Sequence, residues 1–252
     1  MDAGLPEVAV RRLGPLGRYE LRLVLAAAAV ILVGIPFGLL LQQVTTDGPL
    51  TALDESAAVW TNGRVRENDL LISVMHFISF LGKPIFLLFA VGLPALWLLR
   101  HGAHKLVIFL VVTCVGGGIV DTAVKLAVGR TRPLHDEPIV QAFGNSFPSG
   151  HSMSSLVCYG ALLVVFVPLF SPRVRLWAIG STIALVLAIG ASRLVLGVHY
   201  ISDVVGGYVL GAAWLLASVA VFETWRADRG RRTTEPLVEG VEPEETKAAV
   251  SA

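Results

Sequence analysis

Long apolar runs constrain the fold of this chain more than any other feature. Six can be marked, at residues 21–41, 70–99, 105–128, 149–170, 176–196 and 201–222. Each is at least as long as the roughly 20 residues that a helix needs to cross a bilayer. Charged residues make up only 15% of the chain and gather between the runs. Backbone groups in lipid must be satisfied internally, and the alternation of barrel strands is absent. We therefore predict an all-α, polytopic membrane protein with a bundle of six transmembrane helices.

The second run is interrupted by the sequence Gly82-Lys83-Pro84. We expect its membrane-crossing part at residues 84–99, preceded by a short interfacial helix at residues 69–81. The first run follows several arginines, as a signal peptide would, but it is as long as a full span and lacks a small-residue cleavage site. The sequence thus predicts an N-terminal tail (residues 1–20), a membrane domain (21–223) and a polar, disordered C-terminal tail (224–252).

Basic residues indicate how the chain is oriented. They cluster in both tails and in the connections that follow the second and fourth runs. These residues are Arg11, Arg12, Arg18, Arg22, Arg100, Lys105, Arg173, Arg175, Arg226, Arg229, Arg231 and Arg232. With six spans, all four segments lie on one side of the membrane, which the positive-inside rule makes the cytoplasm. We predict a multi-pass protein of the cell membrane with both termini in the cytoplasm. A net charge of +1 does not suggest a nucleic-acid partner.

The opposite side of the membrane carries positive charge that this rule does not explain. Lys125 and Arg132, at the end of the third run, are seven residues apart and would share a face if the helix continued past Gly129. A lysine within a span is usually functional. The alternative is that Lys125 extends to the interface and the arginines bind lipid headgroups.

Two further polar clusters fall on the same side. Pro148-Ser149-Gly150-His151 begins the fourth run, as ordinary helix-start residues do. The free amides of a helix N-terminus also bind anions, and His151 can give or take a proton. His199 and Asp203 are four residues apart, so we expect them to stack on one helical face and form a hydrogen bond. The alternative is a polar pair that holds two helices together.

Together the clusters point to one site. Two histidines, a carboxylate and at least three cations, which include Arg193, map to the same end of one bundle. Cations around one point repel each other unless an anion lies between them. The planar fork of arginine matches phosphate oxygens two at a time. The sequence therefore predicts a phosphate site with an activated histidine beside it.

The three clusters resemble, in order, the three motifs of the type 2 phosphatidic acid phosphatase family: Lys125-x6-Arg132-Pro133, Pro148-Ser149-Gly150-His151 and Ser192-Arg193-x5-His199-x3-Asp203. The active site of that family is similar to those of vanadium-dependent haloperoxidases and glucose-6-phosphatase. The resemblance covers the chain from the third run to the sixth, and every motif residue is present.

The resemblance implies a role for each motif residue. Those expected to bind the phosphoryl group are Lys125, Arg132, Arg193, Ser149 and the amide of Gly150. His199 would attack phosphorus, Asp203 would orient His199, and His151 would protonate the leaving oxygen. Arg130, between the motif positions, would be a helper or a headgroup contact.

We expect no metal or other cofactor. Phosphoryl transfer depends mainly on charge stabilisation, which fixed cations can supply. Asp136 and Glu137 are expected to be solvated loop carboxylates, and Cys114 and Cys158 to be packing residues within apolar runs. The expected activity is metal-independent hydrolysis of a lipid phosphomonoester or diphosphate through a phosphohistidine intermediate. Candidate substrates are polyprenyl diphosphate, phosphatidylglycerol phosphate and phosphatidate.

Two other functions remain open on the sequence alone. A lipid-linked phosphotransferase would share the phosphohistidine intermediate, so hydrolysis and transfer cannot be separated. A transporter or flippase for anionic lipids would distribute its charges through the depth of the membrane, often on broken helices. The charges here gather at one end, which favours an enzyme. Peroxidase chemistry with vanadate is disfavoured by the membrane-embedded chain.

Overall fold

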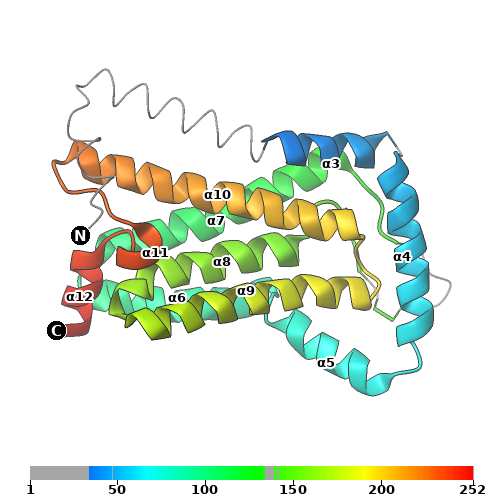
Figure 1. Ribbon diagram of the computed structural model, residues 1–252, viewed down its shortest axis with the longest axis horizontal. Helices are drawn as coiled ribbons and strands as arrows, with labels where there is room; N and C mark the ends of the chain where they lie inside the picture. Colours follow the sequence, from blue (N-terminus) through cyan, green and yellow to red (C-terminus); the bar gives the residue numbers. More distant parts are fainter. Residues whose placement is uncertain (1–33, 47, 134–138, 141, 252) are drawn as a thin grey trace, which may run out of the picture.

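Figure 1 shows the computed structural model, which describes residues 34–46, 48–133, 139–140 and 142–251. All regular structure in this part of the chain is helical. The predicted N-terminal tail and most of the first apolar run lie outside the described residues, as do Asp136 and Glu137. The all-α class is confirmed for what is described.

Four helices form the body of the molecule and run side by side (Figure 1): α7 (His104–Val128), α8 (Gly150–Phe166), α9 (Pro172–Val195) and α10 (Ile201–Asp228). Helix α8 packs against the other three and continues into a 3₁₀ turn at Val167–Leu169. All four are long and apolar enough to cross a membrane, with α8 counted together with its turn. Large apolar side chains are exposed on α7, α9 and α10, as lipid contact requires, whereas α8 lies between these helices.

The interrupted second run forms two helices, as predicted. Helix α5 (Asp69–Phe80) and α6 (Pro84–Arg100) meet at a bend of 45°. Pro84 lies in the first turn of α6, where its missing amide costs nothing. If the bent pair is one span, the described residues contain five candidate spans. Helix α3 (Ile35–Thr45), which includes the end of the first run, is apolar but short. The sixth predicted span therefore depends on residues outside the described part.

The connection after the first run contains a helix that the apolar pattern did not predict. Helix α4 (Pro49–Val65) lies across one end of the bundle (Figure 1). Pro49 begins it, and good helix formers such as Ala52, Ala57 and Ala58 continue it. Asp54, in its second turn, is completely buried against the bundle. This helix closes the end at which the predicted site residues lie.

A close approach between α8 and α10 positions the start of α8. A Cβ atom added at Gly207 would lie 2.6 Å from the carbonyl oxygen of Ser149. Only glycine permits this separation, so α10 can press directly against the backbone of α8. The amide of Ser149 also donates to the carbonyl oxygen of Asp203 at 2.9 Å. The second and third motifs are thereby held together by the backbone.

The structure corrects the prediction of disorder for residues 224–252. Helix α10 continues to Asp228, and two short helices follow, α11 (Pro236–Glu239) and α12 (Pro243–Ser251). Arg226 is buried and forms ion pairs of 2.9 Å with Glu242 and Glu244. A carboxylate oxygen of Glu245 accepts the backbone amides of Lys105 and Leu106 at 3.0 and 3.4 Å, which caps the start of α7. Charge pairing and capping hold this segment together with the burial of Val241 and Ala249 in the hydrophobic core.

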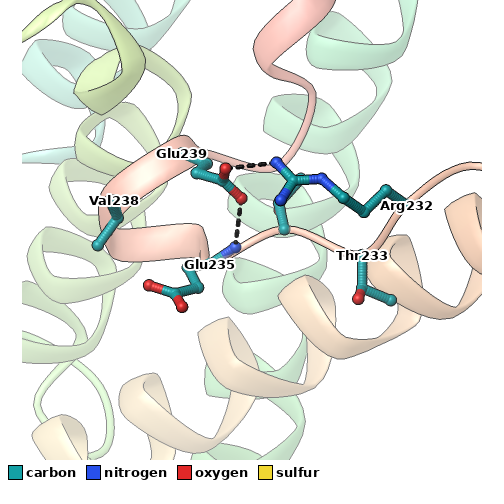
Figure 2. Close-up of a pocket in the computed structure, with 6 residues that line it drawn as sticks. Arg232, Thr233, Glu235, Val238 and Glu239 are labelled. Atoms are coloured by element: carbon teal, nitrogen blue, oxygen red, sulfur yellow. Dashed lines mark hydrogen bonds and ion pairs between the residues drawn. The ribbon is translucent and has the colours of Figure 1, made fainter. Parts of the chain in front are cut away.

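A cleft of about 320 Å³ opens in the C-terminal segment (Figure 2). Arg232 forms an ion pair of 2.5 Å with Glu239 beside it, and the amide of Glu235 donates to the same carboxylate at 3.1 Å. The cleft lies at the end of the bundle opposite α4 (Figure 1). None of the predicted site residues lines it.

Candidate active site

The first motif contains the end of α7 and changes direction at Gly129. Helix α7 ends at Val128, and Gly129 adopts the left-handed conformation with φ of 65°. The helix therefore does not continue to Arg132, so the condition under which Lys125 and Arg132 would share a helical face is not met. The returning loop brings the two parts together instead. The side-chain amide of Asn145 donates to the carbonyl oxygen of Lys125 at 2.7 Å, and Arg132 donates to the carbonyl oxygen of Asn145 at 3.4 Å.

His199 and Asp203 are in contact, with His199 Nδ1 and Asp203 Oδ2 separated by 3.3 Å. The contact does not arise from a shared helical face, because α10 begins only at Ile201. Asp203 is the third residue of the helix and accepts the amide of Tyr200 at 2.9 Å, which forms a helix cap. His199 lies in the preceding turn, and the cap holds its imidazole beside the carboxylate.

The contacts of His199 determine which nitrogen carries its proton. Arg132 Nη1 lies 3.1 Å from His199 Nε2, and a guanidinium can only donate. Nε2 is therefore the nitrogen with the free lone pair, and Nδ1–H donates to Asp203. Burial lowers the pKa of His199 to about 4, although Asp203 acts in the opposite direction. The imidazole is thus neutral at neutral pH, with its lone pair directed at a cation.

Asp203 is fully buried, and both of its carboxylate oxygens are occupied. Oδ2 accepts the hydroxyl of Ser146 in addition to Tyr200 N and His199 Nδ1. Oδ1 accepts Arg130 Nη1 at 2.7 Å. A buried carboxylate needs such partners to remain charged. Four donors from three segments of the chain therefore fix the group that holds His199.

The start of α8 supplies the backbone part of an anion site. Ser149 is the N-cap residue, and its Oγ accepts from Ser152 N at 3.4 Å and Ser152 Oγ at 3.1 Å. A Cβ atom at Gly150 would lie 2.9 Å from Lys125 Nζ, so this ammonium group rests against the helix N-terminus. Lys125 Nζ also forms an ion pair of 2.5 Å with Asp121, one turn earlier on α7. Free amides and an ammonium group thus face the same point.

Two site residues have buried nitrogen atoms without a partner in the described part of the chain. These atoms are His151 Nε2 and Arg193 Nε. Arg193 Nη1 donates to Ser79 Oγ of α5 at 2.5 Å, which fixes the guanidinium on one side only. Buried polar atoms are rarely left unsatisfied. An anion bound at the start of α8 would supply partners for them.

Several residues at the site were not identified from the sequence. Asp54 of α4 accepts Arg130 Nη2 at 2.9 Å, and Ser79, Asp121 and Ser146 contact motif residues as described above. Asp54 carried no motif signal, since it lies 149 positions from Asp203 in a segment without an apolar run. Only its unusual burial, which the structure supplies, distinguishes it.

Arg130, which was expected to be a helper or a headgroup contact, forms ion pairs with two carboxylates of the protein. It donates to both Asp54 and Asp203, and its guanidinium lies 4.1 Å from the centroid of the Tyr200 ring. Burial opposes its charge, but the two carboxylates outweigh burial and raise the pKa of Arg130. It is therefore a fixed cation that neutralises two buried anions.

The arrangement suits phosphoryl transfer. It places Arg132 beside a neutral imidazole with a fixed tautomer, and Lys125 at the N-terminus of the helix that carries His151. A nucleophile oriented by a third group, beside preorganised positive charge, is the arrangement that covalent phosphoryl transfer requires.

Known proteins are similar to this chain in sequence and in fold. The family model of the PAP2 superfamily matches residues 105–227. The lipid A 1-phosphatase of Rhizobium etli is 30% identical over 200 residues, which cover 72% of this chain and 79% of that protein. Phosphatidylglycerophosphatase B of Bacillus subtilis is 36% identical over 96 residues, which cover 37% and 46% of the two chains.

A solved structure agrees in fold. The transmembrane PAP2-type phosphatidylglycerolphosphate phosphatase of Bacillus subtilis superposes with a TM-score of 0.69 at 24% identity, covering 77% of this chain and 96% of that one. The family match spans all three motifs and the four helices that carry them. The chain therefore belongs to the PAP2 superfamily of multi-pass membrane lipid phosphatases.

Proposed function

We propose that this protein hydrolyses a phosphomonoester or diphosphate of a lipid through a phosphohistidine intermediate on His199. The observation that carries this proposal is the orientation of that imidazole. Asp203 accepts its Nδ1–H, and the unprotonated Nε2 faces Arg132, from which it accepts a hydrogen bond. A neutral nitrogen nucleophile beside a phosphate-binding cation is the requirement for in-line attack on phosphorus.

The proposed reaction has two steps. In the first, Nε2 of His199 forms a bond to phosphorus while the bond to the lipid oxygen breaks, and His151 gives that oxygen a proton. In the second, water attacks the phosphohistidine, the bond between phosphorus and Nε2 breaks, and His151 takes the proton of the water, which returns both histidines to their starting states. The products are inorganic phosphate and either the lipid alcohol, from a phosphomonoester, or the lipid monophosphate, from a diphosphate. Asp203 stabilises the positive charge that His199 develops during attack.

Phosphate binding in this proposal uses Lys125, Arg132 and Arg193. In the structure Arg132 occupies the lone pair of His199, so the guanidinium must turn to the phosphoryl oxygens when substrate binds. The start of α8 adds the amide of Gly150 and the hydroxyl of Ser149, whose oxygen already accepts two hydrogen bonds and whose proton can be donated. Three cations and a helix N-terminus can replace the charge of metal ions, so we propose a metal-independent reaction.

The proposed substrate is a lipid with a terminal phosphate. The named relatives are a lipid A 1-phosphatase and a phosphatidylglycerophosphatase, and both names describe a phosphorylated lipid. Phosphatidate and polyprenyl diphosphate also carry a terminal phosphate, so they are candidate substrates as well. A phosphotransferase would use the same intermediate with an alcohol in place of water.

We propose six spans, both termini in the cytoplasm and an extracytoplasmic site. Three of the basic segments flank the end of α6, the start of α9 and the end of α10, all at the end of the bundle opposite the site (Figure 1). Clustering of basic residues at one end is the charge bias that sets orientation. The same separation argues against a transporter, whose charges would extend through the membrane.

A panel assay tests this proposal. The purified protein in detergent would receive lipid A, phosphatidylglycerol phosphate, phosphatidate and polyprenyl diphosphate, and released inorganic phosphate would be measured. We expect release from at least one lipid, persistence in excess EDTA and inhibition by vanadate. Failure on all four lipids would overturn the substrate class. Loss in EDTA with recovery in magnesium would overturn the metal-independent mechanism.

A further inference from the structure

A second buried carboxylate stands behind the site. Asp54 of α4 is almost completely inaccessible, although it is a charged residue on a helix whose next residue, Glu55, is exposed. Burying a carboxylate is costly unless it is paired and hydrogen-bonded. The burial of this carboxylate must therefore be offset by specific partners within the protein.

The contacts of Asp54 all lead to α10 and Arg130. Oδ1 accepts the amide of Ser202 at 3.1 Å, and Oδ2 accepts the hydroxyl of Ser202 and Arg130 Nη2, the latter at 2.9 Å. The amide of Ser202 is one of the free donors in the first turn of α10. Asp54 thus caps the helix that carries Asp203 and holds the far side of Arg130.

Arg130 connects the two carboxylates. Its Nη1 donates to Asp203 Oδ1 and to Ser202 Oγ, both at 2.7 Å, while its Nη2 donates to Asp54. Arginine can bridge two anions because its donors are held in a rigid plane. Without Asp54, the guanidinium would lose the ion pair of its Nη2 and would be hydrogen-bonded only through Nη1, to Asp203 and Ser202. It could then turn about that contact, and Asp203 would lose a fixed donor.

We propose that Asp54 is a positioning residue for the reaction, which acts through Arg130 on Asp203 and thereby on the nucleophile His199. The inference rests on the proposed phosphatase function. Asp54 contacts neither the predicted phosphate ligands nor His199, so its effect should fall on turnover. The affinity of the site for phosphate should be retained, because Lys125, Arg132 and Arg193 remain in place.

Asp54→Asn is the main test, with Glu55→Gln as its matched control on the same helix. The asparagine keeps the size of the side chain, but one of its two polar atoms becomes an amide that faces donors. Turnover (kcat) would be measured on the best lipid substrate and on p-nitrophenyl phosphate, together with the inhibition constant of inorganic phosphate. We expect Asp54→Asn to lower kcat by at least about tenfold, because the loss of a hydrogen bond to a charged group has an effect of about this size. The inhibition constant of inorganic phosphate should stay within about twofold of the wild-type value, because Asp54 does not contact the phosphate ligands.

Two further variants separate positioning from general stability. In an Arg130→Lys background, Asp54→Asn should lower kcat little further. An ammonium group cannot bridge the two carboxylates, so the coupling between Asp54 and Asp203 is already lost. Ser202→Ala removes one donor to Asp54 and should lower kcat by about threefold without changing phosphate inhibition. This milder variant decides the question if Asp54→Asn does not fold.

The outcomes distinguish this inference from the proposed function. If wild-type protein turns over but Asp54→Asn matches Glu55→Gln in kcat, Asp54 has no positioning role. A joint loss of kcat, phosphate inhibition and thermal stability, in Asp54→Asn and in Ser202→Ala, would make the role purely structural and overturn the inference. Inactive wild-type protein on lipids and on p-nitrophenyl phosphate would instead refute the phosphatase proposal, on which this inference depends.

Discussion

Replacing Asp203 by asparagine perturbs the most connected group of the site. Its two oxygens accept four donors, from His199, Ser146, a backbone amide and Arg130. Asparagine offers one oxygen and one amide, so a donor must face a donor whichever way the side chain turns. If the oxygen remains toward His199, the amide meets Arg130. If it turns toward Arg130, the amide meets His199, whose correct tautomer is then lost.

The structure sets the size of the effect. Breaking a buried ion pair by removing one partner costs about 3–5 kcal/mol when the other charge is left alone. Arg130 keeps Asp54, so the smaller figure of about 1.5–3 kcal/mol for a hydrogen bond to a charged group applies to stability. Catalysis should suffer more, because the orientation and basicity of the nucleophile both depend on this carboxylate. We expect kcat to fall by about 10²–10⁴-fold.

The assay combines turnover of a lipid phosphate with thermal unfolding in detergent. Ser146→Ala is the matched control, because it removes a single donor to the same oxygen of Asp203 and leaves the charge. It should lose much less activity than Asp203→Asn. A folded Asp203→Asn protein with kcat within a few-fold of wild type would refute the role of Asp203 in holding His199.

Three further predictions concern the acid, the pH dependence and the orientation. His151→Ala should lose about 10²–10⁴-fold on a lipid phosphate, whose alkoxide needs a proton, and markedly less on p-nitrophenyl phosphate; equal losses on both esters would contradict its role as the acid. Since His199 must be neutral to attack and burial lowers its pKa to about 4, kcat/KM should fall as the pH drops through about 4. An acid limb at the ordinary histidine value of about 6.5 would contradict this reasoning. In a protein without its native cysteines, Phe143→Cys should react with an impermeant thiol reagent in intact cells and Pro172→Cys should not; the reverse pattern would place the site in the cytoplasm.

The main helices could be predicted because a bilayer requires long apolar runs. The expected start and end of the third run, residues 105–128, differ from α7 by one residue at most. Helix α4 was not predicted, because it lies at the end of the bundle and has no apolar run of its own. The ordered C-terminal segment was not predicted either. It is held by the pairing of Arg226 with Glu242 and by the burial of Val241 and Ala249 in the core, contacts between distant positions that composition does not reveal.

The sequence indicated the residues of the site, but not the contacts that hold them together. The sequence indicated that His199 and Asp203 meet, but the cause is a helix cap and not a helical face. The position of Arg132 depends on the left-handed turn at Gly129, where the helix ends. Asp54 reaches the site only through the folding of α4 across the bundle. Spacing within motifs predicts local neighbours, whereas contacts between distant segments require the tertiary structure.

The most direct test of the central claim is capture of the phosphorylated enzyme. Purified protein would be mixed with a lipid phosphate labelled in its terminal phosphorus, quenched with alkali within milliseconds and analysed for protein-bound label. Phosphohistidine survives alkali and is lost in acid, unlike phosphoserine. We predict alkali-stable, acid-labile label on His199 in the wild type, more of it in His151→Ala if that variant slows hydrolysis of the intermediate, and none in His199→Ala. Turnover without any such label, or label that persists in folded His199→Ala, would contradict the proposed mechanism.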